Sequence, residues 1–249
     1  MKTLILLVFL SLTGMCYGQT GSKGVEIHWE LDVSDQKLFK ECRDDIQGNF
    51  AKFMGESGFG DVKPGQTLTM YWTKIAGLGI LQSASASITG PSAKLAYQVQ
   101  RKQLNPGKLL QLKNTQLAEF EKTAQTGIAK SSIIEVLIKD LLQGDATRQC
   151  YYFVFSDMVE NSGIVNCYKS IPATKVQIKK TIEQIDPYLK SKLDKKIEAG
   201  FSPIVVLVQK DSRGKVDSQA IRLFWIDLLD NLSLTNVRLI DNLSNNINR

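Results

Sequence analysis

Hydrophobic and polar positions follow two different periods along this chain. The segment 25–31 alternates residue by residue and runs into Asp32, as a strand that ends at a sheet edge does. Apolar residues then recur at helical spacing from Phe39 to Phe53. This strand and helix form the first of several such units, and Ser34 or Asp35 can cap the helix.

Segments with the period of a strand and segments with the period of a helix continue to alternate to the end of the chain. Further strands are expected at 67–75, 94–100, 151–155, 203–208 and 237–240, and further helices at 117–124, 134–141, 178–185, 189–197 and 221–228. The stretch 76–91, rich in Gly, Ser and Ala, indicates a long connection. Alternating strands and helices predict a doubly wound α/β fold, whose mainly parallel central sheet carries helices on both faces.

The first 18 residues have the features of a secretory signal peptide. Lys2 precedes the apolar run 4–10, and small residues precede Gln19. We expect a signal peptide over 1–18 and one domain over 19–249, because 249 − 18 = 231 residues suffice for a single large core. The protein is then secreted or periplasmic, with a signal of bacterial type. A lipid anchor on Cys16 is the alternative, although Met15 stands where a small residue is expected.

Composition and charge narrow the classes of partner. The chain is 43% hydrophobic and 22% charged, as ordinary globular proteins are. Without the signal's single lysine, the formal charge is 30 − 25 = +5. Lysines are interspersed with acidic residues, as in 190–196, which is typical of a solvated helix face and not of a nucleic-acid surface. No later apolar run reaches the about 20 residues of a membrane-spanning helix.

Three cysteines remain after removal of the signal: Cys42, Cys150 and Cys167. Export to an oxidising compartment permits a disulfide, and Cys150 with Cys167 is the closest pair in sequence. The alternative interpretation is three buried thiols.

Several polar residues are expected at one edge of the sheet. In doubly wound sheets, ligands bind beyond the carboxyl ends of the strands, where the strand order reverses. Asp32, Ser34 and Asp157 follow strand ends, and Thr126 lies in a loop between two helical segments. These residues are therefore the candidates for a binding site.

The run Asp32-Val33-Ser34-Asp35-Gln36 resembles the metal-binding loop of von Willebrand factor type A domains, whose pattern is Asp-x-Ser-x-Ser. The resemblance extends in order along the mature chain, to Thr126 and Asp157 at the places of the family's metal-site threonine and aspartate. It implies one divalent cation, usually Mg²⁺, with an open position for an acidic group of a protein partner.

The chain departs from the family pattern at two points. Gln36 stands in place of the second serine, and its longer side chain would crowd the loop. An insertion before Thr126 leaves Thr123 or Ser131 as alternatives to that threonine. Oxygen ligands of this kind nevertheless suit a small hard cation. With only two carboxylates, such an ion keeps positive charge for an incoming Asp or Glu.

Two functions remain open on these grounds. The first is an exported protein-binding module of the adhesion type, with a degenerate metal-ion-dependent adhesion site. The second is a metal-free structural scaffold of a cell-envelope assembly, in which Asp32, Ser34, Thr126 and Asp157 only cap helices and a turn.

Enzyme classes match the chain poorly. His28 is the only histidine and lies within the first predicted strand. Clusters with zinc spacing, a Walker loop and a Gly-x-Ser-x-Gly elbow are all absent from the sequence. Gly77 and Gly79 start a dinucleotide fingerprint that lacks its third glycine. The run 32–34 is similar to the nucleophile loop of haloacid dehalogenase-like phosphatases, but these need an aspartate where Ser34 stands. We therefore do not expect an enzyme.

Overall fold

The protein is described by a computed structural model over residues 24–57, 62, 65–77, 83–90, 106–125, 130–212, 214 and 216–244. The predicted signal peptide, the predicted strand 94–100 and Thr126 lie outside the described residues. Within these ranges, no helix has the length and apolar character that crossing a membrane requires.

Six strands and six helices have their bounds in the described part of the chain. The strands are β1 Gly24–Asp32, β2 Thr67–Ile75, β3 Ser83–Thr89, β4 Gln149–Ser156, β5 Ile204–Gln209 and β6 Val237–Ile240. The helices are α1 Gln36–Glu56, α3 Pro106–Ala124, α4 Ile133–Gln143, α5 Lys175–Glu183, α6 Pro187–Glu198 and α7 Ser218–Asn231.

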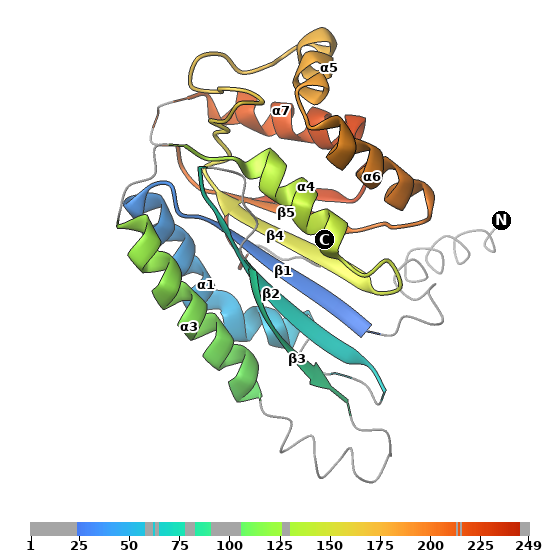
Figure 1. The fold of residues 1–249 in the computed structure, drawn as a ribbon. Helices are drawn as coiled ribbons and strands as arrows, with labels where there is room; N and C mark the ends of the chain where they lie inside the picture. The colour runs from blue at the N-terminus through green and yellow to red at the C-terminus, as the bar shows by residue number, and fades with distance from the viewer. Residues whose placement is uncertain are drawn as a thin grey trace, which may run out of the picture.

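The strands form one sheet in the order β3-β2-β1-β4-β5-β6, which Figure 1 shows at the centre of the molecule. All neighbouring pairs are parallel except β2 and β3, which are antiparallel. Because strand order runs one way from β1 to β3 and the other way from β4 to β6, the switch point lies between β1 and β4. This confirms the predicted doubly wound, mainly parallel α/β fold of the von Willebrand factor type A or Rossmann kind.

The prediction of a long connection over 76–91 is wrong, because β3 lies within it. The strand has the sequence SASASIT, in which serines and a threonine alternate with small apolar residues. Its hydrophobic signal is weak because it is an edge strand with one neighbour. Hydroxyl pairs across the two strands contribute to the pairing with β2: Thr67 with Thr89 at 3.1 Å, and Thr69 with Ser87 at 3.0 Å.

Helices α1 and α3 cover one face of the sheet (Figure 1). Odd-numbered residues of β1 point into this layer, and Trp29 is completely buried. Its ring stacks on Trp72 of β2 at 5.3 Å and on Phe153 of β4 at 5.1 Å, measured between ring centroids. Phe53 of α1 meets the same ring edge-on at 5.4 Å. Stacked aromatic side chains therefore join the centre of the sheet to its first helical layer.

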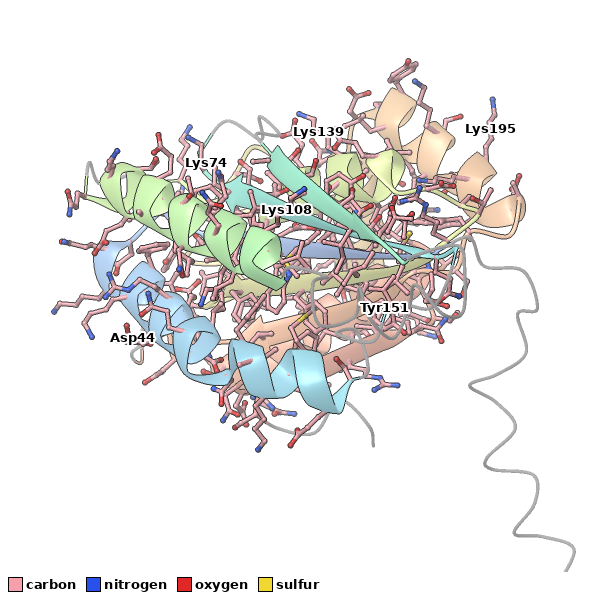
Figure 2. The ribbon with its side chains drawn as sticks, turned by 90° about the horizontal axis from the view of Figure 1, so that it is seen from below. Asp44, Lys74, Lys108, Lys139, Tyr151 and Lys195 are labelled. Carbon is pink, nitrogen blue, oxygen red and sulfur yellow. The ribbon has the colours of Figure 1, made fainter. Side chains whose placement is uncertain are left out.

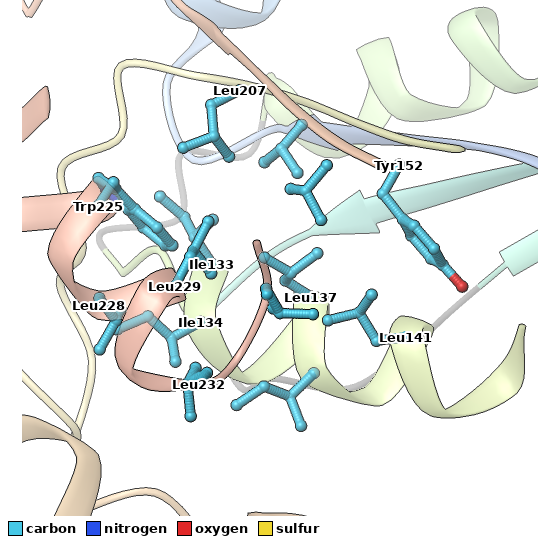
Figure 3. Packing of buried hydrophobic residues seen from close by; sticks show 14 of the residues in the cluster. Ile133, Ile134, Leu137, Leu141, Tyr152, Leu207, Trp225, Leu228, Leu229 and Leu232 are labelled. Carbon is cyan, nitrogen blue, oxygen red and sulfur yellow. The ribbon is translucent and has the colours of Figure 1, made fainter. Parts of the chain in front are cut away.

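Helices α4, α5, α6 and α7 cover the opposite face. Figure 3 shows Ile134 and Leu137 of α4 facing Leu228 and Leu229 of α7 in this second core. Trp225 of α7 is also buried here, and its indole N–H donates to the Met158 carbonyl at 2.8 Å. This bond fixes the loop after β4 to α7.

Helix starts follow ordinary capping rules. The Asp35 carboxylate accepts the N–H groups of Lys37 and Leu38 at the start of α1. Thr174 forms a capping box with Gln177 at the start of α5, and Asp186 caps α6 before a proline. Charged side chains such as Asp44 and Lys195 lie on the outer surfaces of the helices (Figure 2).

Candidate functional site at the carboxyl edge of the sheet

Asp32 ends β1 at the switch point of the sheet and is completely buried. Its Oδ1 atom accepts the backbone N–H of Ser34 at 2.9 Å. Its Oδ2 atom accepts the hydroxyl groups of Ser131 at 2.8 Å and Ser156 at 2.7 Å. Asp32 therefore connects three chain segments that are far apart in sequence.

The two serines come from the segments that flank Asp32 in space. Ser131 precedes α4, and Ser156 is the last residue of β4, the strand beside β1. The Ser156 hydroxyl also accepts the backbone N–H of Met158 at 2.9 Å. Since each serine hydroxyl donates its hydrogen to Asp32, its oxygen lone pairs are directed elsewhere. Such oxygens can be ligands of a cation.

Asp157 follows Ser156 at the same edge, and its side chain is 9% exposed. Its Oδ1 atom accepts the N–H of Val159 at 3.0 Å, which closes a tight turn. Met158 within this turn has a φ of 62°, a conformation that costs a non-glycine residue energy. The loop after β4 is thus folded into one defined shape directly beside Asp32.

The loop after β1 holds the remaining predicted residues. Ser34 is half-buried, and Asp35, rather than Asp32 or Ser34, caps α1. Gln36 is the first residue of α1 and is exposed, so it does not crowd the loop as predicted from its length. The position of the family's second serine is therefore taken by a residue that faces solvent.

The structure brings together Asp32, Ser34 and Asp157, but it does not describe Thr126. Of the two alternatives, Thr123 lies inside α3, whereas Ser131 bonds directly to Asp32. Ser131 is therefore the hydroxyl residue that the described chain provides at the place expected for a threonine. The contribution of Ser156 was missed, although its position at the end of a buried strand was a usable signal.

Glu160 is a further buried carboxyl group near this edge that sequence reasoning missed. Its Oε2 atom accepts the N–H of Ile134 at 3.0 Å, so it caps α4 from the loop after β4. Its Oε1 atom lacks a hydrogen-bond partner. Burial raises the pKa of Glu160 to about 8, although the Ser162 side chain and the N–H groups at the start of α4 oppose the shift. No sequence pattern identifies a helix cap that comes from a distant loop.

The side chains at this edge of the sheet offer the types of ligand atom that a small divalent cation prefers. Asp32 and Asp157 provide carboxylates, and Ser34, Ser131 and Ser156 provide hydroxyl oxygens, all of which are hard ligands. Among the residues that the structure describes, no three His, Cys, Asp or Glu side chains converge on a possible metal position. A cation here would therefore depend on hydroxyl oxygens and water for most of its ligands.

The even-numbered residues of β1 form a second polar feature, which we call the β1 column: Glu26, His28, Glu30 and Asp32. They face α4 and are at most 3% exposed. The predicted strand over 25–31 that ends at Asp32 is confirmed as β1, which is central in the sheet and buried on both faces. Packing on both sides fixes His28 in the core, where its two ring nitrogens face Asp140 and Glu26.

The three cysteines are free and buried, so the possible bond between Cys150 and Cys167 is not formed. Cys150 lies near the start of β4, whereas Cys167 donates its N–H to Glu160 beyond the end of that strand. The length of β4, about 20 Å from Cys150 to its last residue, separates them. A disulfide needs Cα atoms within about 7 Å.

We expect three reactive thiols per molecule when the mature chain is unfolded in denaturant without a reductant. A thiol assay that finds only one would show that a bond has formed and that the arrangement of β4 is different in the secreted protein.

Comparisons with known proteins add little to this geometry. No protein-family model matches the chain, and no curated protein does. Two solved structures of the pilus adhesin SpaC from Lactobacillus rhamnosus GG are similar, one of them in an open conformation, with TM-scores of 0.44 and 0.41 at 9% and 10% identity. Each match covers 90% of this chain and 29% of the adhesin chain, so the chain spans less than a third of the adhesin's length.

Proposed function

We propose that this protein is an exported binding module that holds a divalent cation at the carboxyl edge of its sheet and engages an acidic group of a protein partner. The observation that carries the proposal is the convergence of Ser131 and Ser156 on one oxygen of Asp32 at the switch point. This arrangement orients two hydroxyl oxygens beside a buried carboxylate, and Ser34 and Asp157 lie in the adjoining loops.

The charge of the site determines the kind of partner. Two carboxylates formally balance the charge of a divalent ion, but part of the charge of Asp157 is directed to the N–H of its own turn. Hydroxyl groups and water carry no charge, so the ion keeps a positive potential toward solvent. A carboxylate from an Asp or Glu of another protein is the complementary ligand.

The test is a thermal melt of residues 19–249 in EDTA and then in millimolar Mg²⁺, Mn²⁺ or Ca²⁺. A cation that binds only the folded state at 100 times its Kd stabilises it by about 2.7 kcal/mol, which is a shift of several degrees. We expect Asp157→Ala and Ser131→Ala to lose that shift. The matched control is Asp145→Ala, since Asp145 precedes β4 at the opposite edge of the sheet and that variant should keep it.

The alternative is a metal-free scaffold, and one observation favours it. Asp32 already accepts three hydrogen bonds, so the site is satisfied without an ion. In that case no cation shifts the melting temperature, and chelation leaves partner binding unchanged. An absent shift in the wild-type chain would thus replace the first proposal by the second.

A further inference from the structure

The β1 column contains a charged pair that holds α4 against the sheet. His28 Nδ1 lies 2.9 Å from Asp140 Oδ1, and both side chains are completely buried. The other ring nitrogen of His28 lies 3.5 Å from Glu26 Oε2. The ring is stacked between Tyr71 at 4.4 Å and Tyr152 at 4.2 Å, so it has a single orientation.

Asp140 is the point at which α4 meets this column. It belongs to the second half of α4, and its Oδ2 atom also accepts the hydroxyl of Thr73 at a long 3.4 Å. The remaining side chains of α4 that face inward are apolar, as Figure 3 shows for Ile134, Leu137 and Leu141. Electrostatic attachment of α4 to β1 therefore depends on this one carboxylate.

Every element around His28 contributes titratable or charged groups. They are Glu26 and Glu30 on β1, Tyr71 on β2, Cys150 and Tyr152 on β4, Asp140 on α4, Arg148 before β4 and Lys196 on α6. Arg148 contacts Glu26 at 3.3 Å, and Lys196 Nζ donates to three carbonyls at the end of α4. Arg148 therefore pairs with Glu26 and Lys196 with backbone carbonyls, whereas His28 contacts the Asp140 carboxylate.

The balance of these groups favours a protonated ring. Burial lowers the pKa of His28, but the bonds to Asp140 and Glu26 outweigh it, so the pKa lies above the ordinary 6.5. Stability from this pair is then present in full below pH 6.5 and is lost as pH rises through the folded-state value. Loss of the proton would leave two carboxylates facing a neutral ring in the core.

We propose that protonated His28 is a latch that holds α4 on β1, and that its deprotonation loosens α4. A movement of α4 would also affect the carboxyl edge of the sheet, because α4 begins two residues after Ser131, which bonds to Asp32. This second step, pH-dependent occupation of the cation site, rests on the proposed function. The latch itself does not depend on a cation.

The sequence offers a direct probe, because His28 is the only histidine in the chain. In the tag-free mature protein, the single histidine ring resonance in an NMR titration reports its protonation. In parallel, hydrogen exchange of α4 amides is measured from pH 6 to 9, corrected for the intrinsic pH dependence and compared with β5. We expect the protection of the α4 amides to fall with the same pH midpoint as the titration of the His28 ring. The loss is about tenfold for each unit by which the pKa of His28 in the folded state exceeds its pKa in the unfolded state.

Two variants make the result specific. His28→Gln keeps a flat polar side chain and should remove the pH dependence of α4, while Asp140→Asn should lower the histidine midpoint. The control is Lys139→Gln on the solvent side of α4, where Lys139 pairs with Glu135, and it should behave as the wild type does. The latch is refuted if the protection of the α4 amides does not change at the pH where His28 titrates. It is also refuted if that protection falls by the same amount in His28→Gln.

The cation melts separate this proposal from the proposed function. In the wild type, the rise in melting temperature on adding the cation should be large at pH 6 and small at pH 9. The same rise at both pH values in His28→Gln supports the link between the latch and the cation site. No shift at any pH refutes the cation site alone, because the exchange measurements still decide the latch.

Discussion

Trp29→Ala is expected to lower the free energy of unfolding by about 3–5 kcal/mol, the usual cost of truncating a large buried aromatic residue. Trp29 is completely buried at the centre of β1, with Trp72 and Phe153 stacked against it. Neither neighbour can move into the vacated space without leaving its own strand. A domain with about 5–15 kcal/mol of total stability loses a large part of it. Urea unfolding of the mature chain measures the change.

Two further variants show whether the loss of stability comes from the stacked aromatic packing or from the loss of any apolar side chain. Trp29→Phe keeps an aromatic ring and removes an indole N–H that has no hydrogen-bond partner, so it should cost much less. Leu223→Ala removes a side chain that is 53% exposed on α7 and should change stability by less than about 0.5 kcal/mol. If Trp29→Ala costs no more than Leu223→Ala, the stacked core around β1 is incorrect.

The behaviour of β1 shows how far the sequence determines this fold. Its apolar positions correctly predict a strand followed by a helix, and the order of later units predicts a parallel sheet. The alternation itself is misleading, because a polar position in a strand usually faces water. Here His28 and Glu26 face a buried helix instead, and Asp140, whose carboxylate bonds to His28, lies more than a hundred residues away.

The candidate site shows the same limit. Asp32 and Asp157 were predicted because both follow strands, and parallel strands end at one edge of the sheet. Ser131 appeared only as an alternative, since the sequence does not show which loop residue precedes α4 at the right distance from Asp32. Glu160 gave no signal because its role depends on a hydrogen bond to Ile134 in another element.

Glu160→Gln is expected to stabilise the protein at alkaline pH by about 5 kcal/mol, and to have little effect near pH 4.5. The carboxyl group has a folded-state pKa of about 8 against an ordinary 4.5, mainly because of burial. The folded state therefore binds the proton more tightly, and stability falls as pH rises from 4.5 to about 8. A glutamine cannot ionise, and its amide oxygen can still accept the N–H of Ile134.

The measurement is urea unfolding of wild type and variant in EDTA at half-unit steps from pH 4.5 to 9, with EDTA excluding any bound cation. The difference between the two curves isolates Glu160, because other buried groups such as Glu30 contribute equally to both. Glu183→Gln, on the exposed surface of α5, is the control and should give a flat difference. A variant that is less stable than the wild type at pH 8.5 would mean that the folded state stabilises the charge of Glu160 and does not raise its pKa. Its charge at the start of α4 would then favour the helix dipole, and the loop after β4 would be held by an ionic cap.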